Sequence, residues 1–426
     1  MAQKNNDPLW QRLNLVGTAR CAVRAAFSGA TVLAETLENS PRNRRSATFR
    51  SLQQKNHQHV PDSAVVPPIN TGLQPGAPRQ TRVKPFQRLH ETLATIFLFL
   101  TAALPALAQQ PFQFPTANHA LFDADGGGDR FFVPTVGKTW TSGCFGCVRT
   151  EGWQMHEGLD IRCLQRDKHG EPTDPVMATA DGTVVYINSR PSLSNYGNYV
   201  VIHHRIEGID IFSLYAHLSA IREGLKIGTQ LKAGEAFATM GHTANTSEPI
   251  TKDRAHVHFE LNLLANDHFS TWYKKNYPKE RNDHGDWNGQ NLLGLDPRLI
   301  LMGEHDTTGA NFSLLNFIRN QTELCRVLVR KTEFPWLKRY PMLIKPNPVA
   351  QKEGVAGYEM ALNYNGIPFE LIPRAASEIK GKSKYQLLSV NEPEEKKNPC
   401  RRLVVQRGRH WVLAPRGTTQ LDLLTE

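Results

Sequence analysis

From about residue 131 to residue 259, the chain is a succession of short apolar runs separated by turns, and no segment there repeats with a helical period. The run TADGTVVYI at 179–187 begins with an Asp-Gly turn and continues into alternating β-branched residues. Glycines separate short apolar clusters at 224–241, and HVHFELNLL at 256–264 alternates and is rich in strand-forming residues. These patterns predict a mainly β protein whose central domain is an antiparallel β-sheet.

Polar segments interrupt the pattern and indicate loops. Long polar insertions lie at 165–174 and 247–254, and a polar, aromatic-rich loop is predicted between residues 265 and 293. The stretch GLDPRLIL at 294–301 closes this part of the chain. The central domain is therefore placed at 131–302.

The remaining residues, 303–426, predict a second, smaller β-rich domain. A helix is expected around 312–319, and several strand-like runs follow it. The last of these, RRLVVQRGRHWVLAP, resembles a hairpin that turns at Arg407, Gly408 and Arg409. This part contains no recognisable chemical motif.

The formal charge of the 426-residue chain is +10, but the charge is spread unevenly. The net charge is +8 for residues 1–108, −4 for residues 109–300 and +6 for residues 301–426. A nucleic-acid-binding face needs basic residues clustered on the folded domain. Because the main domain is mildly acidic, we expect no nucleic-acid partner.

Residues 83–108 have the three parts of a secretory signal peptide. Basic residues precede an apolar run over about 93–104, and Ala-Leu-Ala at 106–108 is a small-x-small cleavage signal. The apolar run is short for a membrane span, so no stable span is expected after cleavage. The mature chain would begin at Gln109, which is not the cysteine of a lipid anchor. We expect export to the periplasm or the exterior.

The segment before this signal, 1–82, is polar, rich in Pro, Arg, Ser and Gln, and lacks clear periodicity. We expect a disordered upstream extension of the reading frame, with initiation near Val83 or Leu89 at a non-Met start codon. Residues 109–130 are expected to link the signal to the central domain.

Export implies an oxidising setting in which cysteines pair. A bridge between Cys325 and Cys400 is expected, and Cys163 is expected to pair with Cys144 or Cys147. The CFGC stretch at 144–147 also has the spacing of half a zinc knuckle, but the chain has no second CxxC.

Two histidine motifs carry the chemistry. Residues two apart on a strand point to the same face, so His256 and His258 of HVH enter one site. The stretch HEGLDI places His156 and Asp160 four residues apart. A catalytic zinc needs three protein ligands, and this pair with one histidine of HVH meets that count. The other histidine of HVH and His217 of YAHL have pKa values suited to proton transfer and to hydrogen-bonding an oxyanion.

The same spacings also occur elsewhere in the chain. HALFD at 119–123 lacks the glycine of HEGLDI, and HQH at 57–59 lies in the upstream extension. Other histidines are expected to be hydrogen-bonded or solvated, namely His169, His203, His204 and His242.

The chain resembles the M23 metallopeptidases, the lysostaphin-type and LytM-like peptidoglycan endopeptidases, over about 131–300. The blocks that carry the resemblance occur in the family's order: TSGCFGCVR, HEGLDI, PVMATADGTVVYI, GNYVVIHH, YAHLS, MGHT, HVHFEL and LDPRLIL. By this resemblance His156, Asp160 and His258 would bind Zn²⁺, and His217 and His256 would be the catalytic pair. The implied fold is an antiparallel sheet of the duplicated-hybrid-motif type, with a groove for an extended peptide.

The chain departs from the family pattern at three places. The loop before HEGLDI carries two additional cysteines, Ala244 replaces a glycine common after MGHT, and the insertions at 165–174 and 247–254 flank the ligand blocks. These departures bear on the choice of substrate, because the insertions would shape the groove.

The resemblance implies an exported zinc endopeptidase that cleaves peptide cross-links of peptidoglycan. Two alternatives are a non-catalytic scaffold that activates other cell-wall hydrolases and a secreted protease that acts on proteins. Scaffold members of the superfamily have lost ligands, whereas all five positions are present here. The C-terminal domain could bind the anionic envelope, occlude the groove or be structural, and the oligomeric state stays open.

Overall fold

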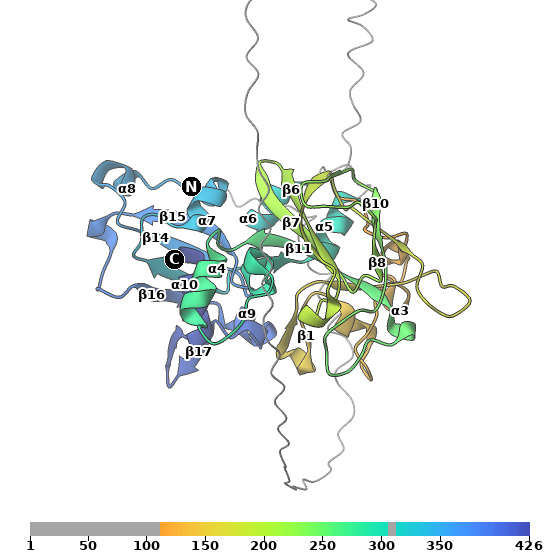
Figure 1. Ribbon diagram of the computed structural model, residues 1–426. Helices are drawn as coiled ribbons and strands as arrows, with labels where there is room; N and C mark the ends of the chain where they lie inside the picture. Colours follow the sequence, from red (N-terminus) through yellow and green to blue (C-terminus); the bar gives the residue numbers. More distant parts are fainter. Residues whose placement is uncertain (1–110, 306–311) are drawn as a thin grey trace, which may run out of the picture. The chain divides into compact units, whose positions relative to one another are not determined.

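The described part of the chain is built around one long antiparallel sheet (Figure 1). The computed structural model describes residues 111–305 and 312–426, all within one compact unit of the chain. The upstream extension and the expected signal peptide lie outside these residues. Among the residues described, no helix has the length and apolar character that crossing a bilayer requires.

The main sheet has seven strands in the order β12-β11-β7-β6-β5-β9, with β3 also paired to β11. Every pair in it is antiparallel, as the sequence predicts. The strands are β3 (Leu159–Arg162), β5 (Gly182–Asn188), β6 (Tyr199–Ile206), β7 (Ile209–Ala216), β9 (Gln230–Leu231), β11 (His256–Leu264) and β12 (Leu292–Leu295).

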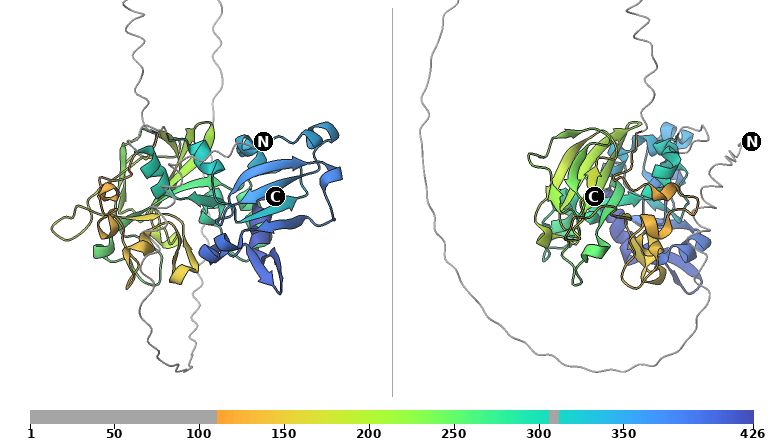
Figure 2. Two further views of the ribbon diagram at one scale, coloured as in Figure 1. Left: turned by 180° about the vertical axis from the view of Figure 1, so that it is seen from behind. Right: turned by 90° about the vertical axis from the view of Figure 1, so that its right-hand side faces the viewer.

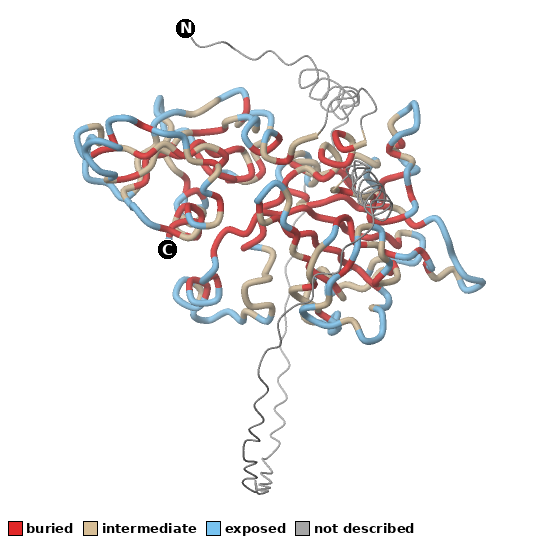
Figure 3. Tube along the Cα trace, turned by 90° about the horizontal axis from the view of Figure 1, so that it is seen from above, coloured by how far each residue is buried: buried red, intermediate tan, exposed pale blue. Residues whose placement is uncertain are grey.

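Strand β11 is the centre of the sheet. All nine of its residues are buried, and Figure 3 shows buried chain running through the middle of the molecule. On one side it pairs first with β3 and then with β12, and on the other side with β7. A strand covered on both faces and paired along both edges is a rigid base for a site.

Two smaller sheets accompany the main one. One consists of β4 (Pro175–Met177), β10 (Ala236–Thr239) and β8 (Ala220–Ile221). The other consists only of β1 (Gly146–Arg149) and β2 (Gln154–His156).

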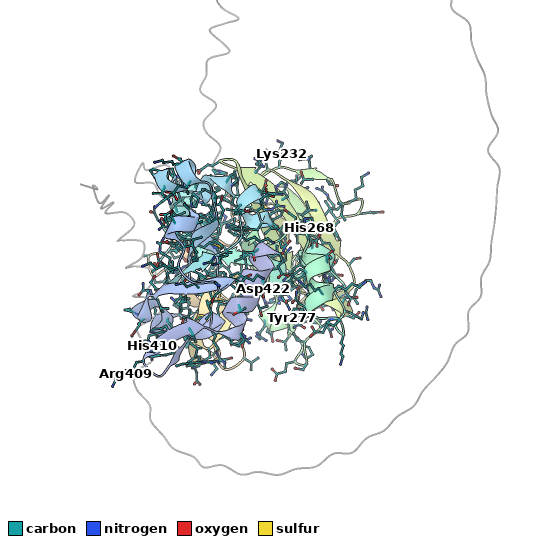
Figure 4. The ribbon with its side chains drawn as sticks, turned by 90° about the vertical axis from the view of Figure 1, so that its left-hand side faces the viewer. Lys232, His268, Tyr277, Arg409, His410 and Asp422 are labelled. Carbon is teal, nitrogen blue, oxygen red and sulfur yellow. A yellow bond between two sulfur atoms is a disulfide. The ribbon has the colours of Figure 1, made fainter. Side chains whose placement is uncertain are left out.

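The C-terminal residues form a four-stranded antiparallel sheet and a hairpin, visible in blue in Figures 1 and 2. The sheet order is β15 (Pro368–Arg374), β14 (Gly357–Leu362), β13 (Cys325–Val329) and β16 (Tyr385–Val390). The hairpin of β17 (Val404–Arg407) and β18 (His410–Leu413) turns at Gly408 and Arg409, within the predicted turn. Figure 4 shows Arg409 and His410 at the edge of the molecule.

Helices connect these strands. The α-helices are α3 (Gly128–Phe131), α4 (Phe269–Asn276), α5 (Pro297–Glu304), α6 (Leu314–Arg319), α7 (Pro335–Arg339), α8 (Pro348–Glu353), α9 (Glu392–Lys397) and α10 (Pro415–Thr425). Short 3-10 helices are η1 (Ala120–Phe122), η2 (Trp140–Gly143), η3 (Thr150–Gly152), η4 (Pro191–Leu193), η5 (Lys252–Arg254), η6 (Gly285–Trp287), η7 (Gly289–Asn291), η8 (Pro341–Leu343), η9 (Ala376–Glu378) and η10 (Pro399–Arg401).

The segment between residues 265 and 293 contains helix α4, so the loop predicted there is wrong in part. Phe269, Trp272 and Tyr273 are buried on one face of this eight-residue helix, while polar residues surround them in the sequence. The spacing of three and four residues is helical, but one short helix shows it only once.

The segment expected as a linker is also packed. Phe112, Phe114 and Leu121 belong to the buried core. Their burial ties residues 111–130 to the domain that follows, because burying each large apolar side chain contributes about 1.5–3 kcal/mol.

The observed disulfide contradicts both expected pairings. Cys147 is bonded to Cys400, whereas Cys325, Cys163 and Cys144 are buried outside any disulfide. The sequence could not show this, because the two bonded cysteines are 253 residues apart and connectivity follows from the fold.

Candidate metal centre

Three side-chain atoms meet at one buried point. Nε2 of His156 lies 3.1 Å from Oδ1 of Asp160 and 3.1 Å from Nδ1 of His258. Nδ1 of His258 lies 3.0 Å from the same Oδ1. Two ligands about 2.1 Å from a tetrahedral zinc ion lie about 3.4 Å apart. The two imidazoles and the carboxylate therefore fit a zinc ion with little movement.

The pairing of the strands brings the three residues together. Asp160 on β3 lies directly opposite His258 on β11. His156 ends β2 and is joined to β3 by only Glu157 and Gly158. The spacing of HEGLDI therefore lets two ligands from one turn meet a third ligand from the central strand.

The glycine of HEGLDI is required by a close approach of two backbones. A Cβ atom on Gly158 would lie 2.3 Å from the carbonyl oxygen of Phe259 and 2.9 Å from Cγ of Glu260. Both neighbours lie on the fully buried β11, so neither can move easily. The stretch HALFD at 119–123, which has the same spacing of histidine and aspartate, has no such glycine.

We expect Gly158→Ala to push the turn away from β11, to lower the stability by about 1–3 kcal/mol and to weaken metal binding. The control is Gly170→Ala, where the φ angle of 78° imposes strain but nothing lies within 4 Å. Thermal melts and zinc titrations of both variants check this. Equal metal affinity in the two variants would contradict the role given to Gly158.

The atoms of the three side chains that face away from the centre are hydrogen-bonded, and these bonds orient the atoms that would bind the metal. Nδ1 of His156 donates to the carbonyl oxygen of Cys144 at 2.7 Å, and Nε2 of His258 donates to Oε1 of Glu260 at 2.7 Å. Each bond leaves the opposite ring nitrogen, Nε2 of His156 and Nδ1 of His258, facing the centre. Nη2 of Arg149 donates to Oδ2 of Asp160 at 2.6 Å, which leaves Oδ1 for the centre.

The electrostatics of the three groups differ. Burial lowers the pKa of His156 to about 4. Burial also opposes protonation of His258, but its bonds to Asp160 and Glu260 outweigh that effect and raise its pKa to about 9. Burial would raise the pKa of Asp160, yet His156, His256 and Arg149 hold it well below its usual range. Asp160 is therefore an anion at neutral pH.

Two donors besides His258 hold the carboxylate of Glu260 in place. The hydroxyl of Tyr196 donates to Oε1 at 2.7 Å, and Nδ2 of Asn262 donates to Oε2 at 2.8 Å. Sequence reasoning missed Glu260, although the alternation of β11 puts it on the same face as His256 and His258. Arg149 and Tyr196 could not be found from the sequence, because each bonds to a residue of another segment of the chain. These residues are Asp160 on β3 and Glu260 on β11.

We expect Glu260→Gln to weaken zinc binding about 10-fold, since a neutral partner lowers the basicity of the bound imidazole. Glu280→Gln is the matched control, because Glu280 is an exposed carboxylate that also accepts a tyrosine hydroxyl, from Tyr273 at 2.8 Å. Competition with a chromophoric chelator measures both affinities. An unchanged zinc affinity in Glu260→Gln would show that Glu260 does not strengthen zinc binding.

Two further histidines face the same site. His217 follows β7 and His256 begins β11, and their ring centroids are 4.8 Å apart. Nδ1 of His217 donates to the carbonyl of Thr243 at 2.8 Å, and Nδ1 of His256 donates to that of Arg254 at 2.6 Å. Both rings therefore keep Nε2 as an acceptor, and Nε2 of His256 lies 3.5 Å from Oδ1 of Asp160.

Burial lowers the pKa of both histidines, that of His217 well below its usual value. They are therefore neutral at pH 7 and able to accept a proton. His217 also has a left-handed backbone with φ of 62°. Non-glycine residues in such conformations are costly and concentrate at functional sites.

The structure thus brings together all five residues singled out in the sequence, whereas His119 and Asp123 of HALFD have other partners. His119 packs on Phe114 with ring centroids 4.8 Å apart, and Asp123 pairs with Arg130 at 2.8 Å. The HQH stretch lies outside the described residues.

The other histidines named in the sequence analysis are hydrogen-bonded to other residues or exposed. His203 bonds to Asp210 at 2.9 Å, and Nε2 of His204 bonds to Ser213 at 2.7 Å. His169 is exposed.

The two polar insertions contact each other. Nη1 of Arg166 donates to the carbonyl of Lys252 at 2.7 Å, and Nζ of Lys252 pairs with Glu171 at 2.6 Å. Glu171 also lies 3.1 Å from Nε2 of His242. The insertions therefore form one joined feature of the surface.

Comparisons with known proteins identify the family of the chain. Residues 154–270 match the model described as Peptidase family M23, and this segment contains all five residues. The Lipoprotein NlpD of Yersinia enterocolitica is 34% identical over 95 residues, which are 22% of this chain and 84% of that protein. The chain therefore belongs to peptidase family M23, a family of zinc metallopeptidases that act on peptidoglycan.

Two other matches cover less of their proteins. The Murein hydrolase activator NlpD of Escherichia coli (strain K12) is 34% identical over 128 residues, 30% of this chain and 27% of that protein. A zinc containing peptidase from Vibrio cholerae, a crystal structure, is 30% identical over 25% of this chain and 26% of that chain, with a TM-score of 0.19. The chain spans less than a third of the length of most curated relatives it matches.

Proposed function

We propose that the protein is an exported zinc metalloendopeptidase that hydrolyses peptide cross-links of bacterial peptidoglycan. The observation that carries the proposal is the convergence of His156, Asp160 and His258 on one buried point, with His217 and His256 beside it. A chain that only supported other proteins would have no need to keep all five. The export signal at 83–108 belongs to this proposal and is checked by sequencing the N-terminus of the native protein.

His156, Asp160 and His258 would hold the zinc ion. Bound there, zinc supplies Lewis acidity, which polarises a scissile carbonyl and lowers the pKa of water. Zinc binding would displace the proton that His258 carries at neutral pH. One carboxylate and two neutral imidazoles would then leave a net charge of +1 on the centre. Arg149 and Glu260 keep the three donor atoms aimed inward.

His217 and His256 would move the protons of the reaction. Their Nδ1 atoms are committed to backbone carbonyls, so each ring works through Nε2. In the neutral form, Nε2 accepts the proton of the attacking water, and the protonated ring then donates to the leaving amine. The protonated ring also hydrogen-bonds the developing oxyanion.

A second candidate is a non-catalytic scaffold that activates other cell-wall hydrolases. It is favoured by the relatives named Murein hydrolase activator. A third candidate, a protease that acts on proteins, uses the same site and differs only in substrate.

One experiment separates the three. The purified full chain is analysed for zinc and incubated with purified peptidoglycan and, in parallel, with casein. Bound zinc with release of peptides from peptidoglycan alone is expected. A chain without zinc and inert on both substrates supports the scaffold, and cleavage of casein alone supports the general protease.

A further inference from the structure

The short segment 144–149 supports two of the three metal-binding side chains. The carbonyl of Cys144 accepts the bond from His156, and the guanidinium of Arg149 binds Asp160. The strand β1 within this segment pairs with β2, where Gly146 lies opposite His156. A shift of this segment would therefore displace both His156 and Asp160.

Cys144 is buried in the core and Phe145 and Val148 pack against it, but the strand pairing of the segment is limited to β2. β1 and β2 form a two-stranded sheet that pairs with no other strand among the described residues. The turn that joins them contains Thr150 and Glu151 with φ of 48° and 56°, a conformation that is costly for both residues. An isolated two-stranded hairpin is marginally stable in water.

The C-terminal part of the chain contacts this sheet directly. Cys400 on η10 is bonded to Cys147 in the middle of β1, and its Sγ also lies 3.8 Å from Sδ of Met155. The 3-10 helix η10 packs along β2, the strand that ends in His156.

Two side chains next to the bridge add to this contact. The guanidinium of Arg402 stands 5.3 Å from the ring centre of Trp153 in the β1–β2 connection. The hydroxyl of Tyr364 approaches Gly146 so closely that a Cβ there would lie 3.2 Å from it. Both the connection and the first residue of β1 are therefore braced by residues of the C-terminal part.

We propose that the Cys147–Cys400 disulfide is a positioning device of the metal centre, by which the C-terminal part holds β1 and, through it, His156 and Asp160 in the metal-binding geometry. This inference rests on the proposed function, because it concerns the same centre. It gives the C-terminal residues a role in assembling the site, in addition to any contact that they make with the cell wall.

The size of the expected effect follows from the contacts that β1 makes. Removing a group that is hydrogen-bonded to a metal ligand and orients it weakens metal binding about 10- to 100-fold. Loss of the bridge frees two such groups together, the Cys144 carbonyl and the Arg149 guanidinium. We therefore expect zinc to bind at least about 10-fold more weakly without the bridge.

The test uses the full chain and the double variant Cys147→Ala/Cys400→Ala. The zinc dissociation constant is measured by competition with a chromophoric chelator, and Co²⁺ absorption reports the geometry of the ligands. Leu421→Ala is the control, because Leu421 is fully buried in α10 and its loss lowers overall stability without removing a group from β1. All proteins are compared at a temperature where circular dichroism shows them folded.

If the double variant does not fold, a second measurement on the wild-type chain replaces it. The bridge of the folded wild-type chain is reduced with a water-soluble phosphine, which becomes a phosphine oxide with oxygen from water while two thiols form. Zinc affinity and the Co²⁺ spectrum are then recorded on the reduced protein.

The proposal expects weaker zinc binding and an altered Co²⁺ spectrum when the bridge is absent, and wild-type values in Leu421→Ala. Unchanged affinity without the bridge overturns it. An equal loss in Leu421→Ala also overturns it, since the effect would then follow overall stability. If the wild-type chain binds no zinc, the proposed zinc peptidase is refuted, and this inference, which rests on it, is refuted as well.

Discussion

His156→Ala is expected to lose zinc and to lower kcat/KM on peptidoglycan by about 1,000-fold or more. The change removes one of three donor atoms, and Lewis-acid stabilisation by a bound metal contributes several kcal/mol to the transition state, which corresponds to roughly this factor. The β-sheet should persist, because His156 lies at the end of β2 and outside the main sheet. Metal analysis, circular dichroism and peptide release are the measurements.

The matched control is His203→Ala. His203 is also a histidine bonded to a carboxylate, that of Asp210 at 2.9 Å, but it lies on β6 away from the centre. This variant should keep both zinc and activity. Zinc-dependent hydrolysis that survives in His156→Ala would refute the assignment of the metal ligands.

His217→Asn is expected to keep zinc and to lose most of its catalytic rate. Asparagine tolerates the left-handed backbone at this position better than alanine, so the φ of 62° is preserved while the imidazole is removed. General acid–base catalysis contributes about 10²–10⁴ in rate, and kcat should fall by that factor. KM should change much less, because His217 acts on protons rather than on binding.

The contrast between these two variants separates metal binding from proton transfer. Zinc content is therefore measured on His217→Asn beside the kinetics. Loss of zinc in this variant would place His217 among the ligands, and an unchanged kcat would remove it from the catalytic pair.

Each of the two metal-binding motifs could be predicted from the sequence because its own geometry is local. That they meet at one centre, through the pairing of β3 with β11, was implied only by the resemblance to the M23 metallopeptidases. Alternation along one strand places His256 and His258 on one face, and a turn with a glycine brings Asp160 back beside His156. The antiparallel sheet followed for the same reason, from runs whose period is visible within a few residues.

Contacts between distant segments could not be predicted in this way. Arg149 reaches Asp160 from another strand, and Cys147 meets Cys400 across 253 residues. Neither has a period or a spacing that a sequence could show.

Helix α6 matches the helix expected around 312–319, but the other helices of the C-terminal part were missed for a different reason. Helices α7, α8 and α9 have only five or six residues, too few to repeat an apolar spacing, whereas α10 has eleven. A signal was nevertheless present, because α7, α8 and α10 all begin with a proline, which is favoured at the first helical position.

The central claim is that the five converging residues make a working zinc peptidase for the cell wall. The most direct test is to digest purified, defined muropeptides with the zinc-loaded full chain and to identify the products by mass. One zinc ion per chain and products that differ from the substrate by one water across a peptide bond are the predicted result. A protein that contains no zinc and leaves every muropeptide intact would contradict the account.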